Sequence, residues 1–530
     1  MARALPDELD LELALDEPDD EAALRGRAAK KLRVGIEAVP HVVIRKRSID
    51  ARKGRVRFHV LLGLAPEEAP RALGEPLPRE VSGPLCAIVV GDGPAGLFCA
   101  YELARQGLRA VVLDRGKPVQ PRRHDLKGLQ RKGTVSPESN YCFGEGGAGT
   151  YSDGKLYTRA HKRGDVRDVI ETLALHGAPA AILVDARPHI GSNKLPKVIT
   201  GMRERLEACG VELRFESRVV GLRVEGAGSD RRVRGVSLAS GEILEADHVV
   251  MATGHSARDV FGILLDAGVR LEPKAFALGV RIEHPQPLID RLQYGRDHGH
   301  PKLPAASYRL AREVEGRGVF TFCMCPGGWI VPASTEVDGL VVNGMSLSRR
   351  DSPFANSGLV VSVEPEDWAR AGFSGPLGGV ALQRAIEVRA MQAGGGELGA
   401  PATRVTDFLR GRGSSTVPAS SYLPGLVGGD VAEVLDGAGV PFAARLREAL
   451  RAFDRRMHGY ATEEAVLVAT ESRTSAPVRV PRDPQTLEAR DLRGLYPAGE
   501  GAGYAGGIVS AAMDGVRIGR AIGRAIRERA

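Results

Sequence analysis

Cysteine is scarce in this sequence, and its few copies follow no recognisable framework. Six cysteines occur in 530 residues, and only Cys323 and Cys325 stand close together, as a C-x-C pair. Disulfide-stabilised domains are short and dense in cysteine, and a structural zinc site needs four ligands at paired spacings. The sequence therefore predicts neither a disulfide framework nor a bound metal.

Long apolar runs are absent as well. No stretch of about 18 apolar residues occurs, so no membrane-spanning helix is predicted. Residues 1–10 lack the basic segment followed by an apolar core that marks a secretory signal peptide. The net charge of +7 is small for this length and does not by itself indicate nucleic-acid binding. We therefore expect a soluble, cytoplasmic protein.

The first 82 residues have the pattern of a small α+β module. Leucines alternate with other residues near the start, as in a half-buried strand, and Asp19 and Asp20 precede a helical stretch that they can cap. The order strand, helix, strand, strand follows, and then a segment rich in Pro and Glu. The expected elements are a strand at 9–15, a helix at 22–32, strands at 41–49 and 55–62, and a linker at 65–80.

Charge is polarised within this module. Residues 1–23 carry nine acids and one base, whereas residues 24–59 carry twelve bases and two acids. A basic hairpin of this kind can bind RNA or an acidic partner. Alternatively, the acidic strand and the basic hairpin neutralise each other across one sheet. We favour the second interpretation, and we expect no nucleic-acid partner.

The strongest motif lies at Gly91-Asp92-Gly93-Pro94-Ala95-Gly96, directly after the apolar strand Cys86–Val90. In a G-x-G-x-x-G turn, Gly91 permits the tight bend, Gly93 lets a pyrophosphate approach the backbone, and Gly96 lets the following helix pack on the strand. Pro94 and Ala95 begin that helix, whose N–H groups attract phosphates. The motif predicts a dinucleotide-binding strand–turn–helix unit.

The next strand supports this interpretation. Residues 110–113 are apolar and end at Asp114, followed by Arg115, within the roughly 20-residue distance expected for a carboxylate that binds ribose hydroxyls. An acidic residue there also argues against a 2′-phosphate at this site.

Two later motifs indicate which dinucleotide binds. Asp247–Gly254 is an acid, an apolar strand and then Ala252-Thr253-Gly254, which resembles the second signature of FAD-dependent two-dinucleotide-binding flavoproteins. Leu495–Gly501, which contains Gly499 and Glu500, resembles their late flavin-binding strand. Glu500 stands where those proteins usually have Asp. Gly506-Gly507-Ile508 then opens a final helix, whose positive end is expected to face the flavin.

A glycine-rich segment, Gly144–Thr150, lies between these motifs. Its backbone can approach a ligand closely because side chains are nearly absent, although a flexible loop would show the same composition. Similar glycine runs contact flavin in glutathione-reductase-2-like flavoproteins. The predicted cofactor site therefore comprises Gly91, Gly93, Pro94, Ala95, Gly96, Asp114, Arg115, Gly146, Gly147, Gly149, Thr150, Val219, Ala252, Thr253, Gly254, Gly499, Glu500, Gly506, Gly507 and Ile508.

With these motifs in order, residues 85–530 resemble a bacterial group of uncharacterised FAD-dependent dehydrogenases. The resemblance extends to Arg47–Arg52, Phe322–Gly328 and Asn343–Ser346. It implies non-covalent FAD and an α/β fold: a Rossmann-type FAD-binding domain with an inserted mixed α+β substrate domain and a small N-terminal α+β module. The expected boundaries are 1–82 for the module with its linker, 83–270 and 481–530 for the FAD-binding domain, and 271–480 for the insertion.

The reaction is less defined by sequence than the cofactor. Weak catalytic candidates are His255, which follows a strand that ends at the ligand edge, His284, Arg281, and the pair Cys323 and Cys325. No C-x-x-x-x-C pair follows the first glycine motif, so disulfide reduction of the glutathione-reductase type is not expected. No second complete dinucleotide motif occurs, so any NAD(P)H would be a transient donor.

We therefore expect hydride transfer between an unidentified small-molecule substrate and flavin N5. Two other hypotheses stay open at this point. One is a flavin-containing protein that binds or modifies RNA. The other is a non-catalytic protein in which FAD is structural.

Overall fold

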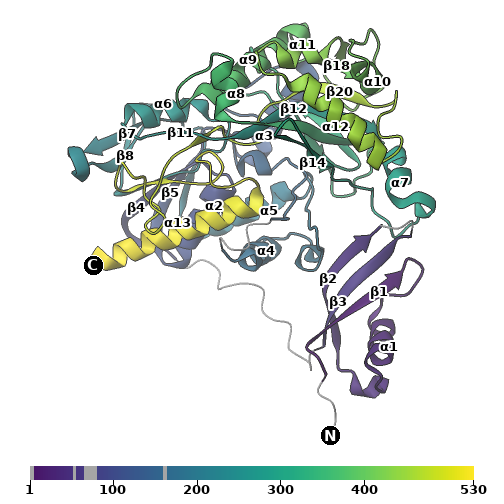
Figure 1. Ribbon diagram of the computed structural model, residues 1–530. Helices are drawn as coiled ribbons and strands as arrows, with labels where there is room; N and C mark the ends of the chain where they lie inside the picture. Colours follow the sequence, from purple (N-terminus) through teal and green to yellow (C-terminus); the bar gives the residue numbers. More distant parts are fainter. Residues whose placement is uncertain (1–4, 52–54, 65–79, 159–163, 530) are drawn as a thin grey trace.

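The computed structural model describes residues 5–51, 55–64, 80–158 and 164–529 (Figure 1). Most of the linker expected at 65–80 lies outside the described residues. A small N-terminal module stands beside a larger body that contains two main sheets. Within the described ranges, none of the helices combines the length and the apolar character needed to cross a bilayer.

The N-terminal module is the predicted βαββ unit. Its antiparallel sheet has the order β1-β3-β2, and alternate leucines of β1, such as Leu11 and Leu13, are buried. The Asp20 side chain caps the helix by accepting the Ala23 N–H at 3.0 Å. The elements are β1 (Glu8–Ala14), α1 (Glu21–Leu32), β2 (Val42–Asp50) and β3 (Arg57–Leu64).

Opposite charges meet inside this module. Arg47 of β2 forms an ion pair with Asp19 at 2.6 Å, and Arg57 of β3 lies 3.7 Å from Glu12 of β1. Pairing of β1 with β3 places the acidic strand directly against part of the basic hairpin. These contacts agree with the interpretation of internal neutralisation.

A five-stranded parallel sheet forms the base of the larger body, in the order β22-β10-β4-β5-β6. Ala87 and Val89 of β4 pack into one hydrophobic cluster, and Ile88 and Val90 pack into another on the opposite face. A strand buried on both faces is apolar throughout, which is the pattern of a parallel sheet. The strands are β4 (Ser82–Val90), β5 (Leu108–Leu113), β6 (Glu212–Arg214), β10 (His248–Met251) and β22 (Leu495–Pro497).

Two helices far apart in sequence, α2 and α13, lie against each other and pack on one face of this sheet (Figure 1). Gly515 allows the close approach, because a Cβ there would stand 2.0 Å from the Ala95 carbonyl oxygen. The helices and the three-stranded crossover sheet of this domain are α2 (Pro94–Arg105), α3 (Val119–Lys132), α4 (Val166–Leu175), α5 (Leu195–Ala208), α6 (Arg258–Asp266), α13 (Ile508–Arg529), β7 (Val219–Glu225), β8 (Arg232–Leu238) and β9 (Ile243–Glu245).

The second main sheet has seven strands, in the order β13-β14-β17-β12-β20-β18-β19, and helices cover it. Its strands are β12 (Phe276–Pro285), β13 (Ala311–Val314), β14 (Arg317–Cys325), β17 (Phe354–Val363), β18 (Ala400–Arg404), β19 (Leu426–Gly428) and β20 (Val466–Glu471). The helices are α7 (Gln286–Tyr294), α8 (Pro365–Arg370), α9 (Gly378–Ala393), α10 (Val405–Leu409), α11 (Val431–Asp436) and α12 (Phe442–Arg456). Two separate two-stranded antiparallel sheets are also present: β15 (Gly328–Pro332) with β16 (Val342–Ser346), and β11 (Glu272–Pro273) with β21 (Val478–Arg479).

Candidate cofactor and active site

A cavity of about 370 Å³ opens where the parallel sheet meets the second main sheet. Its lower wall is formed by the loops that follow β4, β5 and β10, which all leave the carboxyl edge of the parallel sheet. Ligands of doubly wound sheets bind at this edge. The opposite wall comes from the second sheet and its connections: Phe322, Cys323, Asn343, Glu471, Arg473 and Thr474.

The glycine motif shapes the floor of the cavity. Gly91 has a φ of +102°, and a Cβ there would lie 2.5 Å from the Ala252 carbonyl oxygen. Gly93, by contrast, has open space toward the cavity, since the atom nearest to an added Cβ is the Gly147 Cα at 3.9 Å. No side chain caps the N-terminus of α2, so its N–H groups are available to a phosphate. This cradle fits a dinucleotide pyrophosphate.

The Asp114 carboxylate holds the loops around this cradle together through hydrogen bonds. It accepts backbone N–H groups of Asp92 at 3.0 Å, Gly116 at 2.8 Å and Gly144 at 2.9 Å. It also lines the cavity, so its predicted contact with a ribose stays a prediction beside this structural role. The adjacent Arg115 side chain forms ion pairs with Glu138 and Asp259.

The glycine-rich segment is held by a side chain that the sequence motifs do not reveal, Arg122 of α3. Its buried guanidinium donates to the carbonyls of Asn140 at 2.9 Å, Tyr141 at 3.1 Å, Glu145 at 2.8 Å and Gly147 at 2.9 Å. These bonds hold the segment against the glycine motif, where a Cβ on Gly147 would lie 2.9 Å from the Gly93 Cα.

Most of the predicted cofactor residues line the cavity, and four support it from behind. Gly96 lies against β4, Gly146 has a φ of +75°, Thr150 donates to the Glu145 carbonyl at 2.7 Å, and the Gly499 N–H donates to Asp514 at 2.9 Å. The predicted residues that line the cavity are Gly91, Gly93, Pro94, Ala95, Asp114, Arg115, Gly147, Gly149, Val219, Ala252, Thr253, Gly254, Glu500, Gly506, Gly507 and Ile508.

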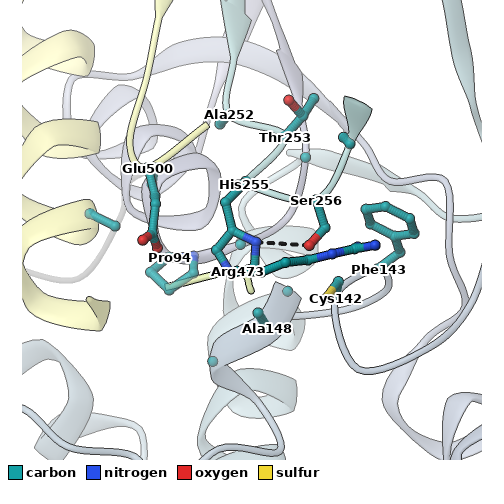
Figure 2. Close-up of a pocket in the computed structure, with 18 of the residues that line it drawn as sticks. Pro94, Cys142, Phe143, Ala148, Ala252, Thr253, His255, Ser256, Arg473 and Glu500 are labelled. Atoms are coloured by element: carbon teal, nitrogen blue, oxygen red, sulfur yellow. Dashed lines mark hydrogen bonds between the residues drawn. The ribbon is translucent and has the colours of Figure 1, made fainter. Parts of the chain in front are cut away.

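Among the catalytic candidates, His255 and Cys323 line the cavity. Figure 2 shows the His255 ring beside Arg473, and its Nδ1 lies 2.8 Å from the Ser256 hydroxyl. Burial, with the nearby Arg473 and Arg258 cations, lowers the pKa of His255 to about 4. The imidazole is therefore neutral at pH 7 and can either donate or accept a hydrogen bond.

The other three candidates lie outside the cavity. His284 is buried on β12, where its Nε2 donates to the Tyr460 carbonyl at 2.8 Å, so a direct role on a ligand in this cavity is not supported. Arg281 is also buried and forms an ion pair with Glu471 at 3.0 Å, which leaves it unable to bind a substrate carboxylate there. Cys325 is buried behind Cys323.

A buried network of charged side chains lies at the cavity wall, and the sequence motifs did not predict it. Glu387 of α9 accepts hydrogen bonds from Arg258 at 2.8 and 2.9 Å and from Arg473 at 3.0 and 3.1 Å. Although burial opposes ionisation, these two cations lower the pKa of Glu387. The network fixes Arg473 at the cavity. Its members come from three distant parts of the chain, so no local motif marks them.

Glu500 lies in the cavity wall next to the beginning of α2, as Figure 2 shows with Pro94. Burial raises the pKa of Glu500 to about 7, and the Lys274 cation only partly opposes this effect. The carboxyl is therefore protonated in the folded protein at slightly acidic pH and becomes charged as the pH rises through about 7.

We expect Glu500→Gln to remove a pH dependence of cofactor affinity. In the native protein, raising the pH from about 6 to about 8 places a negative charge near the phosphate cradle, so the dissociation constant of the dinucleotide rises. The folded protein also holds the Glu500 proton more tightly than the unfolded chain does. The stability that this proton contributes is fully present below pH 4.5 and is lost as the pH rises through about 7. Fluorescence titration at several pH values measures the affinity. The exposed Glu463→Gln serves as control, and parallel profiles for all three proteins would contradict the assignment.

Comparison with known proteins decides the family. A model described as the C-terminal domain of FAD-dependent proteins matches residues 275–474, an FAD binding domain matches residues 87–122, and a domain of unknown function, DUF8436, matches residues 5–64. An uncharacterized protein from Clostridium beijerinckii is 40% identical over 529 residues, which cover 96% of each chain. The chain belongs to a family of uncharacterised FAD-dependent proteins. FAD is therefore its cofactor, and the cradle of glycines fits it.

Solved flavoprotein structures show only distant similarity to this FAD-dependent protein. A flavoprotein/dehydrogenase from Cytophaga hutchinsonii is 10% identical, with a TM-score of 0.35, over 84% of this chain and 79% of that one. The flavin-dependent brominase Bmp2 is 12% identical, with a TM-score of 0.36, over the same shares of the two chains.

Within the described residues, no cluster of three or more His, Cys, Asp or Glu side chains is arranged to hold a metal ion.

Proposed function

We propose that this protein is an FAD-dependent oxidoreductase that transfers hydride between a small-molecule substrate and the flavin. The observation that carries the proposal is the shared cavity. One wall consists of the glycine cradle and the loops after β5 and β10, and the other consists of polar side chains from the second sheet. A substrate bound against the second wall would face the cofactor bound against the first.

The chain's own residues supply positioning and proton handling in this proposal. Arg473, fixed by Glu387, and Asn343 offer donors to a polar substrate. His255 is neutral and lies beside Arg473, so it is the side chain we propose for hydrogen bonding to the group that gains or loses a proton (Figure 2). Bound FAD supplies the two-electron chemistry.

An anaerobic absorbance experiment tests this function. We expect the oxidised flavin bands of the purified holoenzyme to bleach when NADH or NADPH is added, because transfer of hydride to the flavin removes these bands. Free FAD under the same conditions is the control for direct reduction. A second measurement follows chemically reduced holoenzyme as it passes electrons to a small quinone acceptor. A flavin that neither donor reduces and that no acceptor reoxidises would instead be structural, and the proposal would fail.

A further inference from the structure

Cys323 and Cys325 end strand β14 at the wall of the FAD cavity, and their backbone departs from a regular strand. The pairing of β14 with β17 slips between Phe322 and Cys325, so β14 carries one extra residue there. Cys323 takes up this bulge with a φ of +43°, which is unusual for a residue with a side chain. Cys323 lines the cavity, and Cys325 is buried behind it.

Cations surround the two sulfurs. The Lys155 Nζ lies 3.8 Å from the Cys323 Sγ and 3.6 Å from the Cys325 Sγ, and an Arg281 Nη lies 3.7 Å from the Cys325 Sγ. Two acidic groups complete the surroundings: Asp153 forms an ion pair with Lys155 at 3.1 Å, and Glu471 forms one with Arg281 at 3.0 Å. Cationic neighbours stabilise a thiolate, which is the reactive form of cysteine.

The two thiols differ in acidity. A hydrogen bond from the Cys325 side chain lowers the pKa of Cys323, and Lys155 and Arg281 add to this effect against burial. The same hydrogen bond and burial raise the pKa of Cys325. For Cys99, by contrast, burial raises the pKa, and the Glu102 and Asp514 carboxylates add to this effect. Simple packing therefore does not account for the charges around the C-x-C pair.

The geometry points to a redox-active dithiol: Cys323 and Cys325 convert between a dithiol and a disulfide, with the FAD of the same cavity as their two-electron partner. This inference rests on the proposed redox function of the flavin. In the oxidation, an S–S bond forms between the two Sγ atoms. The Cys323 thiolate and the Cys325 thiol together lose one proton and two electrons, which is one hydride equivalent, and oxidised FAD accepts it. Reduction reverses each of these changes.

The spacing of the two cysteines along the chain suits a disulfide. Residues two positions apart have Cα atoms separated by at most about 7 Å, and a disulfide spans about 4.4–6.8 Å. The spacing of the pair is therefore within the range of a disulfide, and Lys155 contacts both sulfurs.

Electron counting with the holoenzyme tests the dithiol. Air-oxidised protein is titrated with dithionite under anaerobic conditions, and the uptake per FAD is compared among variants. We expect the native protein to take up two electrons more per FAD than Cys323→Ser or Cys325→Ser. Cys142→Ser removes another thiol from the same cavity and is expected to leave the uptake unchanged. If the buried Cys325→Ser does not fold, the Cys323→Ser comparison is sufficient.

Mass spectrometry gives a readout that does not depend on flavin. After denaturation, an alkylating reagent should leave both cysteines of the 323–325 peptide unmodified in oxidised protein and modify both after reduction. Lys155→Met should slow alkylation of Cys323 in the native reduced protein several-fold near neutral pH, because loss of the cation raises its pKa, and Lys155→Arg should restore the rate.

The outcomes separate this inference from the proposed function. Equal electron uptake in native protein and both cysteine variants, with both thiols alkylated in oxidised protein, would overturn the dithiol even if nicotinamide bleaches the flavin. The extra two electrons and the blocked peptide would support it even where NADH, NADPH and quinone all fail to react with the flavin.

Discussion

Replacing Gly93 with valine is expected to abolish FAD binding while the protein still folds. In the structure, a Cβ at this position meets no atom closer than 3.9 Å, so the protein itself has room for it. The added side chain would instead occupy the space between the uncapped N-terminus of α2 and the cavity, where the pyrophosphate must approach the backbone. The ratio of flavin to protein absorbance after purification, and fluorescence titration of the apoprotein, measure the loss.

A glycine in an open position outside the cavity provides the matched control. Gly128 lies within α3, and an added Cβ there meets nothing within 4 Å. Gly128→Val should therefore retain full flavin content, and its unfolding temperature should stay close to that of the native protein, since helix formation disfavours glycine. If Gly93→Val also retained its flavin, the cradle would not be the FAD site. If Gly93→Val failed to fold as apoprotein, the loss of flavin would have another cause.

The parts of the fold that follow from local patterns could be predicted from the sequence. The strand that ends at Val90, the glycine motif Gly91–Gly96 and the helix α2 form one continuous unit. Each of these parts is recognised from residue types that lie close together in the sequence. The same holds for the final helix, α13, which begins at the predicted Ile508. Such elements depend on periodicity and turn chemistry over a few residues, which a single sequence contains.

The candidate catalytic residues were harder to place, because β12 is buried on both of its faces. Burial on both faces removes the polar alternation that tells which side of a strand faces a cavity. Arg281 and His284 therefore looked equally available. In the structure neither side chain lines the cavity: Arg281 lies behind the wall residue Glu471 and donates to it, and His284 donates to the Tyr460 carbonyl. Their positions therefore do not support the acid/base role considered for His284 or the carboxylate-binding role considered for Arg281.

The residues that the sequence did not reveal act through long-range contacts. Lys155 reaches Cys323 across 168 positions, and Arg258 reaches Glu387 across 129 positions. Each is an ordinary basic residue in its own local context. Their importance follows from burial beside other charges, and burial becomes known only when distant elements are packed together.

Arg122→Met is expected to destabilise the folded protein and to lower its affinity for FAD. Methionine retains much of the apolar volume but removes the donors to four carbonyl groups at residues 140, 141, 145 and 147. Buried carbonyls without a donor cost free energy, so the free energy of unfolding should fall by on the order of 3 kcal/mol or more. The freed segment should no longer hold Gly147 against Gly93. Thermal unfolding of the apoprotein and FAD titration measure the two effects separately.

Arg123→Met is the matched control, because it changes the same residue type one position along the same helix. The Arg123 side chain is exposed, so both stability and FAD affinity should remain near native values. Arg122→Lys keeps the positive charge but loses the planar guanidinium that reaches several carbonyls at once, so it should recover only part of the stability. Full recovery by lysine would show that charge alone is needed. Equal effects of Arg122→Met and Arg123→Met would show that the carbonyl contacts do not hold the glycine-rich segment, and the fit of FAD to its cradle would need another support.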